Sequence, residues 1–186
     1  MKDTSIELQG IKVNLRLIRR TDKDFYYSVG FEHEDKESAY YTGSTGTFTK
    51  EMTDKYIDKI VDDESRYDFL IFDKANRLLG EAVINSIDEE SRQAGFRICL
   101  FQAQQFGKGV GTEATRLVVK FAFESLQLHR LELEVYDYNP RAKHVYEKVG
   151  FVQEGVKRDA AFLYDAYRNV IIMSMLETDY HNSLGD

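Results

Sequence analysis

Residues 106–112 read Phe106-Gly107-Lys108-Gly109-Val110-Gly111-Thr112. An apolar run ending at Phe101 precedes this segment, and a helical pattern follows it. Alternate glycines allow backbone N–H groups to point into one concavity, and the N-terminus of the following helix adds the positive end of its dipole. The segment therefore predicts a seat for a phosphate group, with a flexible glycine-rich turn as the alternative.

Two known nucleotide-binding patterns can be compared with this loop. A P-loop needs Lys followed by Ser or Thr after its last glycine, and that pair is absent. A dinucleotide-binding fingerprint fits Gly109, Gly111 and Ala114, with Glu132 or Glu134 at the right distance for a ribose contact. However, polar residues separate the loop from its strand, and the loop comes late in the chain. An NAD-dependent oxidoreductase is therefore the weaker alternative.

The elements around the loop follow from hydrophobic periodicity. Strands are expected at 12–19, 67–72, 78–86, 94–101, 130–136, from 151 onward and at 168–176. Helices are expected from Thr21 to about 31, from Thr49 to about 62, and at 112–126 and 140–149. Residues 32–43 are expected to form a loop that can hold a short helix. A hairpin meander followed by β-α-β-α predicts an α+β fold, with helices on both faces of a mixed sheet.

Composition narrows the class of protein. The 186 residues are 42% hydrophobic and 31% charged, with 32 acidic and 25 basic residues and a net charge of −7. We expect one domain over 1–186, with neither a nucleic-acid nor a membrane partner. Residues 1–5 lack the apolar run of a signal peptide, and the single cysteine cannot form an internal disulfide, so a cytoplasmic location is expected. His33, His129, His144 and His181 lack ligand spacing, so no metal is expected.

A second motif follows the strand at 130–136. It reads Asn139-Pro140-Arg141-Ala142-Lys143-His144-Val145-Tyr146-Glu147-Lys148-Val149-Gly150-Phe151. Pro140 suits the first turn of a helix, Gly150 ends that helix, and Ala142 and Tyr146 share one of its faces. This motif and the glycine loop, in this order and at this separation, resemble the GCN5-related N-acetyltransferase (GNAT) superfamily over nearly the whole chain.

Three further features are similar to the RimJ/RimL-type subgroup of that superfamily. They are the opening segment 15–22, the closing segment 166–169 before an apolar strand, and the aromatic Phe106. This subgroup includes ribosomal-protein N-terminal acetyltransferases, and spermidine acetyltransferases are its close relatives. The resemblance implies a GNAT fold: a mixed, mostly antiparallel sheet in which two parallel strands splay apart. It also implies a homodimer.

The resemblance also implies acetyl-CoA as cosubstrate, held between strands 94–101 and 130–136. Pantetheine would bind backbone around Cys99 to Phe101, pyrophosphate would bind the amides from Gly107 to Thr112, and Asn139 would hydrogen-bond the pantetheine. The implied coenzyme-binding set is Cys99, Leu100, Phe101, Phe106, Gly107, Lys108, Gly109, Val110, Gly111, Thr112, Asn139, Ala142 and Tyr146.

The implied chemistry is direct attack of a primary amine on the thioester in a ternary complex. Tyr146 carries over as the general acid for the departing thiolate. The base is open, because Gly95 stands where relatives often have Glu. Glu81, Glu132 or Glu134 are candidates, as is a water relay.

The acceptor amine belongs to a protein N-terminus or a small molecule, with a polyamine as an alternative. A non-catalytic acyl-CoA-binding module is a further alternative. The acceptor is expected near the loop after the first strand and residues 162–167. Cys99 is expected to be a small buried hydrophobe, and not an acyl carrier.

Overall fold

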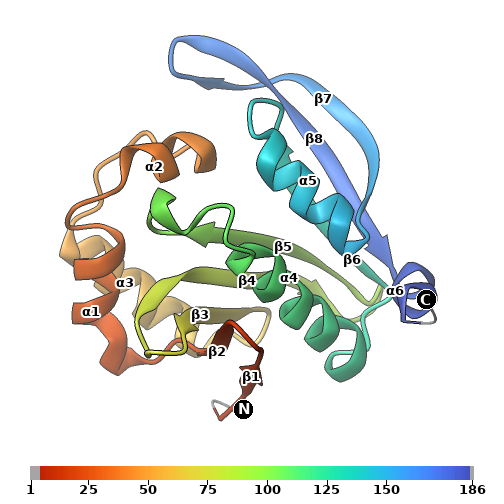
Figure 1. The fold of residues 1–186 in the computed structure, drawn as a ribbon, viewed down its shortest axis with the longest axis horizontal. Helices are drawn as coiled ribbons and strands as arrows, with labels where there is room; N and C mark the ends of the chain where they lie inside the picture. Colours follow the sequence, from red (N-terminus) through yellow and green to blue (C-terminus); the bar gives the residue numbers. More distant parts are fainter. Residues whose placement is uncertain (1–4, 185–186) are drawn as a thin grey trace.

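The computed structural model describes residues 5–184, so the N-terminal residues 1–4 of the signal-peptide expectation lie outside it. The strands form one eight-stranded sheet in the order β1-β2-β3-β4-β5-β6-β8-β7 (Figure 1). Their bounds are β1 Glu7–Gln9, β2 Val13–Leu17, β3 Tyr67–Asp73, β4 Leu78–Asp88, β5 Gln93–Leu100, β6 Arg130–Tyr136, β7 Val152–Leu163 and β8 Ala166–Leu176. Within the described residues, β5 and β6 are the one parallel pair.

Helices cover both faces of this sheet. Their bounds are α1 Lys23–Gly30, α2 Lys36–Thr42, α3 Lys50–Val61, α4 Val110–Lys120, α5 Pro140–Val149 and α6 Glu177–Ser183. One core cluster joins the sheet to α4 and α5, and a second joins it to α1 and α3. Alternate residues along a strand belong to different clusters, because successive side chains of a strand point to opposite faces. The α+β architecture is confirmed.

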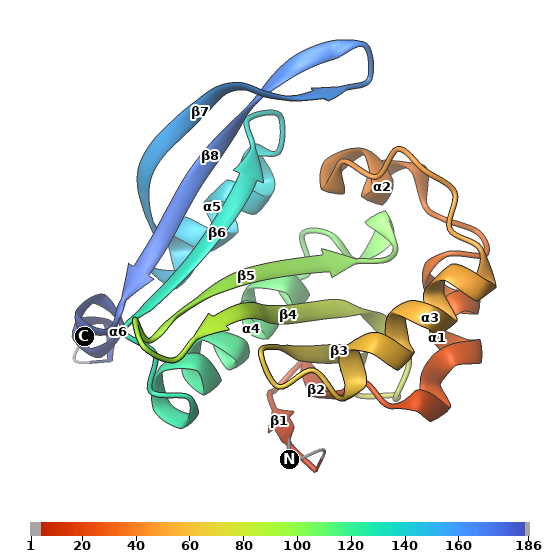
Figure 2. The ribbon, with the colours of Figure 1, turned by 180° about the vertical axis from the view of Figure 1, so that it is seen from behind.

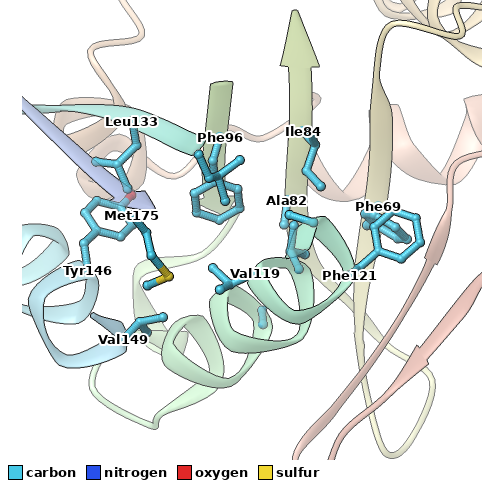
Figure 3. Close-up of a cluster of buried hydrophobic side chains, with 14 of the residues drawn as sticks. Phe69, Ala82, Ile84, Phe96, Val119, Phe121, Leu133, Tyr146, Val149 and Met175 are labelled. Atoms are coloured by element: carbon cyan, nitrogen blue, oxygen red, sulfur yellow. The ribbon is translucent and has the colours of Figure 1, made fainter. Parts of the chain in front are cut away.

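The larger core cluster continues from one half of the sheet to the other (Figure 3). Phe69 and Phe121 meet edge to face at one end, with ring centroids 5.4 Å apart. At the other end Phe96 stacks on Phe151 at 6.2 Å and meets Tyr146 at 6.4 Å. This apolar layer packs β5 against α5 even beyond the point where β5 and β6 stop pairing.

The parallel strands β5 and β6 separate after a short contact. They pair only at Gln93–Arg130, Ala94–Leu131 and Gly95–Glu132, and beyond that point they diverge (Figure 2). The splayed parallel pair is therefore confirmed. A doubly wound dinucleotide fold needs an array of parallel strands, so the oxidoreductase alternative is wrong. The glycine spacing that prompted it belongs to the start of α4.

Three helices differ in detail from the sequence expectation. Helix α4, expected at 112–126, begins at Val110 and ends at Lys120, and a π-helical turn, Phe121–Ser125, continues it. Thr21 lies in a short 3-10 turn, Arg20–Asp22, and α1 begins after it, because Asp22 turns inward to bind Arg16 at 2.7 Å. Helix α3 begins after the expected cap Thr49, but its buried face is not the apolar stripe of Met52, Tyr56 and Ile60 that the sequence contains. Thr53, Ile57 and Ile60 are the buried residues, while half of Met52 is exposed. Thr53 tolerates burial since its hydroxyl donates to the carbonyl of Lys50.

Candidate active site

The opening between β5 and β6 holds a cavity of about 470 Å³, walled also by α2, α4 and α5. Ten of the expected coenzyme residues line it: Cys99, Leu100, Phe106, Gly107, Gly109, Gly111, Thr112, Asn139, Ala142 and Tyr146. Phe101, Lys108 and Val110 do not. Phe101 and Val110 are buried in the core, and the Lys108 carbonyl accepts a hydrogen bond from Lys12.

A smaller cavity of about 170 Å³ adjoins the first. The two share four wall residues: Ser38, Thr42, Arg97 and Cys99. The smaller cavity is closed by the aromatic residues Phe31, Phe48 and Phe101 and by two carboxylates, Glu34 and Glu81. Cys99, on β5, therefore borders both cavities.

The glycine loop takes its shape from two left-handed residues. Gly107 has φ = 73° and Gly109 has φ = 81°, a region that side-chain-bearing residues adopt at a cost. Gly109 is also the N-cap of α4, so the first free N–H groups of the helix lie beside the cavity. This arrangement offers backbone donors and a positive helix end to an anion.

Tyr146 lies on α5 and is almost fully buried, with its ring against Phe96 and Phe151. Burial, with a smaller contribution from Cys99, raises the pKa of this phenol well above its ordinary value of 10.0. The hydroxyl has no hydrogen-bond partner among residues 5–184, and the side chain lines the larger cavity. Tyr146 is therefore a protonated donor held ready beside the cavity.

Asn139 uses both side-chain polar atoms within the protein. Its Oδ1 accepts from the Ala142 N–H at 3.1 Å and so caps α5, and its Nδ2 donates to the Tyr41 carbonyl at 3.2 Å. One lone pair of Oδ1 and the second hydrogen of Nδ2 are not used in these bonds and are open to a ligand. The residue thus joins α5 to α2 at the wall of the cavity.

Glu81 is nearly fully buried on β4 and belongs to a polar network below the smaller cavity. Tyr26 donates to it at 2.8 Å, and the Arg97 guanidinium forms an ion pair with it. Arg97 also donates to Tyr56 at 2.8 Å. Burial raises the pKa of Tyr26 well above its usual value, so Tyr26 remains a donor. The other two candidate bases lie on β6: Glu132 pairs with Arg130, and Glu134 pairs with Lys157 and lines the larger cavity.

Gly95 lies where the resemblance implies Glu. A Cβ on Gly95 would lie 2.5 Å from Oδ1 of Asn85 on the neighbouring strand. Because Oδ1 is the far end of a flexible side chain, a residue larger than glycine at this position requires Asn85 to turn away.

Sequence analysis did not identify Arg97 and Ser38 as residues of the two cavities. Arg97 lies two residues before Cys99 on β5, so the two side chains share one face of the strand, and strand periodicity was the available signal. Ser38, on α2, donates to the Leu100 carbonyl, and its hydroxyl lies 3.9 Å from the Cys99 thiol. No sequence pattern signals this contact, which joins residues 62 positions apart. Burial, followed by the charge of Glu81, raises the pKa of Cys99 to about 12, so it is a neutral thiol.

The expected acceptor segment 162–167 forms the tip of the β7–β8 hairpin and reaches α2. The Tyr164 hydroxyl hydrogen-bonds the Ala39 and Ser44 carbonyls at 3.2 and 2.9 Å. From the loop after β6, Tyr138 donates to the Tyr40 carbonyl at 3.0 Å. The opening has two arms, the strands β1 to β5 on one side and β6 to β8 on the other. Helix α2 contacts the first through the Ser38 hydrogen bond to Leu100 and the second through the hydrogen bonds from Tyr138 and Tyr164. Phe162 and Tyr167 are mostly exposed.

Two searches of residues 5–184 bear on partners. No helix there is long and apolar enough to cross a membrane. No group of three or more His, Cys, Asp and Glu side chains is placed to hold a metal ion.

Comparison with known proteins agrees with the geometry. The family model described as "Acetyltransferase (GNAT) domain" matches residues 12–152. Spermidine N(1)-acetyltransferase of Vibrio cholerae is 28% identical, over 92% of this chain and 96% of the relative. Probable N-acetyltransferase YjcK of Bacillus subtilis is 30% identical, over 94% and 92%. Ribosomal-protein-serine acetyltransferase of Escherichia coli is 30% identical, over 55% and 56%.

The solved structures include the V. cholerae spermidine N-acetyltransferase in complex with CoA and spermine. It superposes with a TM-score of 0.82 at 26% identity, covering 92% of this chain and 99% of that one. The family match, the splayed strands and the cavity between them agree. The chain belongs to the GNAT acetyltransferase family and is an acetyl-CoA-dependent N-acetyltransferase.

Proposed function

We propose that the acetyl acceptor is a small aliphatic polyamine, which enters through the smaller cavity and is acetylated on a primary amine. The proposal depends on one observation: Glu34 and the aromatic residues Phe31 and Phe48 line the same cavity. This cavity adjoins the larger one at Cys99. A carboxylate and aromatic faces both attract ammonium groups. The cavity of about 170 Å³ suits a slender chain better than a folded protein terminus.

Two further observations support this acceptor class. The net charge of −7 favours the approach of a cation. Relatives named as spermidine acetyltransferases match about nine-tenths of this chain, whereas the relative named for a ribosomal protein matches 55%. The protein N-terminus is the competing acceptor.

The proposed reaction is a direct transfer. The neutral amine nitrogen attacks the thioester carbon, the carbon–sulfur bond breaks, and the thiolate takes a proton from Tyr146. The pyrophosphate would lie on the amides from Gly107 to Thr112, and the pantetheine along Cys99 to Phe101. Cys99 forms no acyl intermediate, because a thiol with a pKa of about 12 is a weak nucleophile at neutral pH.

The amine must lose a proton before it attacks, since a free alkyl amine is protonated at neutral pH. We propose Glu81 as the acceptor of this proton, through water in the smaller cavity that it lines. Glu81→Gln should lower kcat and change the acid side of the pH profile. Tyr26→Phe is the matched control, since it removes a hydrogen bond to Glu81 and keeps the carboxylate. An unchanged pH profile in Glu81→Gln would leave the water relay alone as the path.

The deciding experiment is an acceptor panel with acetyl-CoA: spermidine, spermine, a monoamine of matched length and a peptide with a free N-terminus. We expect kcat/KM for spermidine to exceed that for the peptide by about tenfold or more, which corresponds to one good ionic contact. Glu34→Gln should raise the KM for spermidine and leave the KM for acetyl-CoA unchanged. Preference for the peptide would overturn the polyamine assignment, and binding of CoA with no amine turned over would indicate a binding module.

We also propose a cytoplasmic homodimer. Support comes from β7, an edge strand of 12 residues on which Val152 and Val156 are exposed. Unpaired edges of this length are normally covered. Light scattering should give twice the chain mass of 21.6 kDa, and cell fractionation should place the protein with cytoplasmic markers. A monomeric mass would contradict the dimer.

A further inference from the structure

The turn between β1 and β2 is closed around a carboxylate from α4, which lies beside these strands (Figure 1). Glu113, in the first turn of α4, accepts hydrogen bonds from three consecutive N–H groups: Ile11 at 3.0 Å, Lys12 at 2.7 Å and Val13 at 2.9 Å. Successive N–H groups that converge in this way form an anion-binding nest. The ligand of this nest is the protein's own side chain.

Gly10 shows how closely the turn fits its carboxylate. A Cβ at this position would lie 2.9 Å from Cδ of Glu113 and 2.8 Å from the Val13 carbonyl oxygen. Any larger residue must therefore displace either the carboxylate or the turn. The contact spans about a hundred positions of sequence, so it ties the N-terminal strands to the helix that begins at the glycine loop.

The nest also controls the charge of Glu113. Burial opposes ionisation of this carboxyl, but the hydrogen bonds from Lys12, Val13 and Ile11 outweigh it and lower its pKa. Glu113 does not line the cavity that Gly109, Gly111 and Thr112 line. The turn therefore holds the carboxylate on the side of α4 that faces β1 and β2, and not in the cavity, where it would repel a phosphate.

Lys12 reaches the glycine loop itself. Its Nζ donates to the Lys108 carbonyl at 2.8 Å, between the left-handed Gly107 and Gly109. The peptide bond between Lys108 and Gly109 is trans, so its C=O and N–H point in opposite directions. Holding the carbonyl toward Lys12 turns the Gly109 N–H away from Lys12. Gly109 lines the cavity and Lys12 does not, so this orientation supplies a donor to the cavity.

We propose that Gly10, Lys12 and Glu113 form a clasp that positions the glycine loop for the coenzyme. The three residues act through the loop, as positioning residues, and they touch neither the reacting thioester nor the amine. Gly107 and Gly109 flank Lys108 and give this segment of backbone freedom to rotate, and the clasp removes that freedom before the ligand arrives. The inference rests on the proposal that this loop binds the pyrophosphate.

The test compares two acetyl donors in Lys12→Met: acetyl-CoA, and acetyl-pantetheine, which lacks the nucleotide and its pyrophosphate. We expect the KM for acetyl-CoA to rise about tenfold, the effect of losing one charge-assisted hydrogen bond. The kcat, the KM for the amine and the kcat/KM for acetyl-pantetheine should be unchanged. Lys12→Arg should restore much of the acetyl-CoA affinity, because it keeps a donor at this position.

Lys55→Met is the control for loss of a lysine elsewhere on the surface. Lys55 pairs with Glu51 on α3 at 2.7 Å, and neither residue belongs to the clasp or to the glycine loop. This substitution should leave the kinetic constants for acetyl-CoA and for acetyl-pantetheine unchanged. Glu113→Gln should reproduce the selective loss of acetyl-CoA, because a neutral amide binds the nest less strongly.

Other outcomes overturn the clasp. A lower melting temperature of Lys12→Met with unchanged KM for acetyl-CoA would make the contact structural only. Equal losses with both donors would mean that the whole site is disturbed. A loss in Lys12→Met without one in Glu113→Gln would mean that Lys12 itself binds the phosphate. If the wild-type enzyme uses both donors equally well, the pyrophosphate assignment of the loop fails first.

Discussion

At the scale of single residues, the phenol of Tyr146 can be tested apart from its ring. Tyr146→Phe keeps the packing against Phe96 and Phe151 and removes only the donor. We expect kcat to fall by about 10²-fold, the lower end of general-acid contributions. The KM for acetyl-CoA should stay within about twofold.

The pH dependence gives a second check. Burial raises the pKa of Tyr146, so the wild-type phenol stays protonated throughout the neutral and mildly alkaline range. The kcat of the wild-type enzyme should therefore show no decline from this group below its ordinary pKa of 10.0. Steady-state rates across pH with both proteins make the comparison, and an unchanged kcat in Tyr146→Phe would remove the acid role.

Residues within a local motif were predictable from the sequence. The glycines of 107–111 and Tyr146 belong to segments in which spacing alone places them at a helix start and on a helix face. Ser38 and Glu113 were not predictable as site residues, because their contacts lie 62 and about 100 positions away. Such pairs depend on the completed fold, and no periodicity encodes them.

At the scale of elements, the sequence located the helices better than their buried faces. In α3 the polar Thr53 replaces Met52 in the interior, because its hydroxyl is satisfied by a local carbonyl. Helix α2 was expected only as part of a loop, and its residues 36–42 become a wall of both cavities. Side chains of other elements hold it there, so local propensity carries little of its stability.

The hairpin tip should contribute measurably to the placement of α2. Tyr164→Phe removes the hydroxyl that binds two carbonyls near the C-terminal end of α2. We expect a loss of about 1 kcal/mol in the free energy of unfolding. Urea titration measures it, and Tyr167→Phe, at a mostly exposed position on the same tip, is the control. Equal effects of the two substitutions would contradict a specific role for the Tyr164 contact.

The strands β6 and β7, which flank β8, share an acid-sensitive ion pair. The hydrogen bond from Arg130, followed by one from Ser174, lowers the pKa of Glu154 from its ordinary 4.5 to about 2. The unfolded chain therefore binds this proton at a higher pH than the folded protein does. The stabilisation is fully present above about 4.5 and is lost as the pH falls toward 2.

The substitution Glu154→Gln should make stability depend less steeply on pH in that window. Chemical unfolding at a series of acidic pH values measures the slope. Glu89→Gln, at an exposed position after β4, should leave the slope as in the wild type. A wild-type slope in Glu154→Gln would mean that the pair is screened by solvent.

At the scale of the whole molecule, strand pairing in the interior of the sheet is shortest where the coenzyme is expected. Only three residue pairs join β5 to β6, while the core cluster under them stays continuous from Phe69 to Met175 (Figure 3). The sequence pattern predicted the hairpin meander and the mixed sheet, but neither the neighbouring order β6-β8-β7 nor the width of the opening. Both depend on how elements far apart in the chain meet in space.

A ligand that contacts both arms of the opening should stabilise the folded protein as a unit. At 100 times its dissociation constant, acetyl-CoA or CoA adds about 2.7 kcal/mol. For a chain of this length that corresponds to a rise of about 5–10 °C in the melting temperature. NAD is the matched control, because it carries adenine and a pyrophosphate but no pantetheine, and it should give no comparable shift. Differential scanning fluorimetry with the three ligands measures the shifts. Two outcomes would contradict this expectation. A two-step transition in which CoA stabilises only one step would show that the two arms unfold separately. A shift with NAD equal to that with CoA would mean that the glycine loop alone, without the strands of the opening, determines binding.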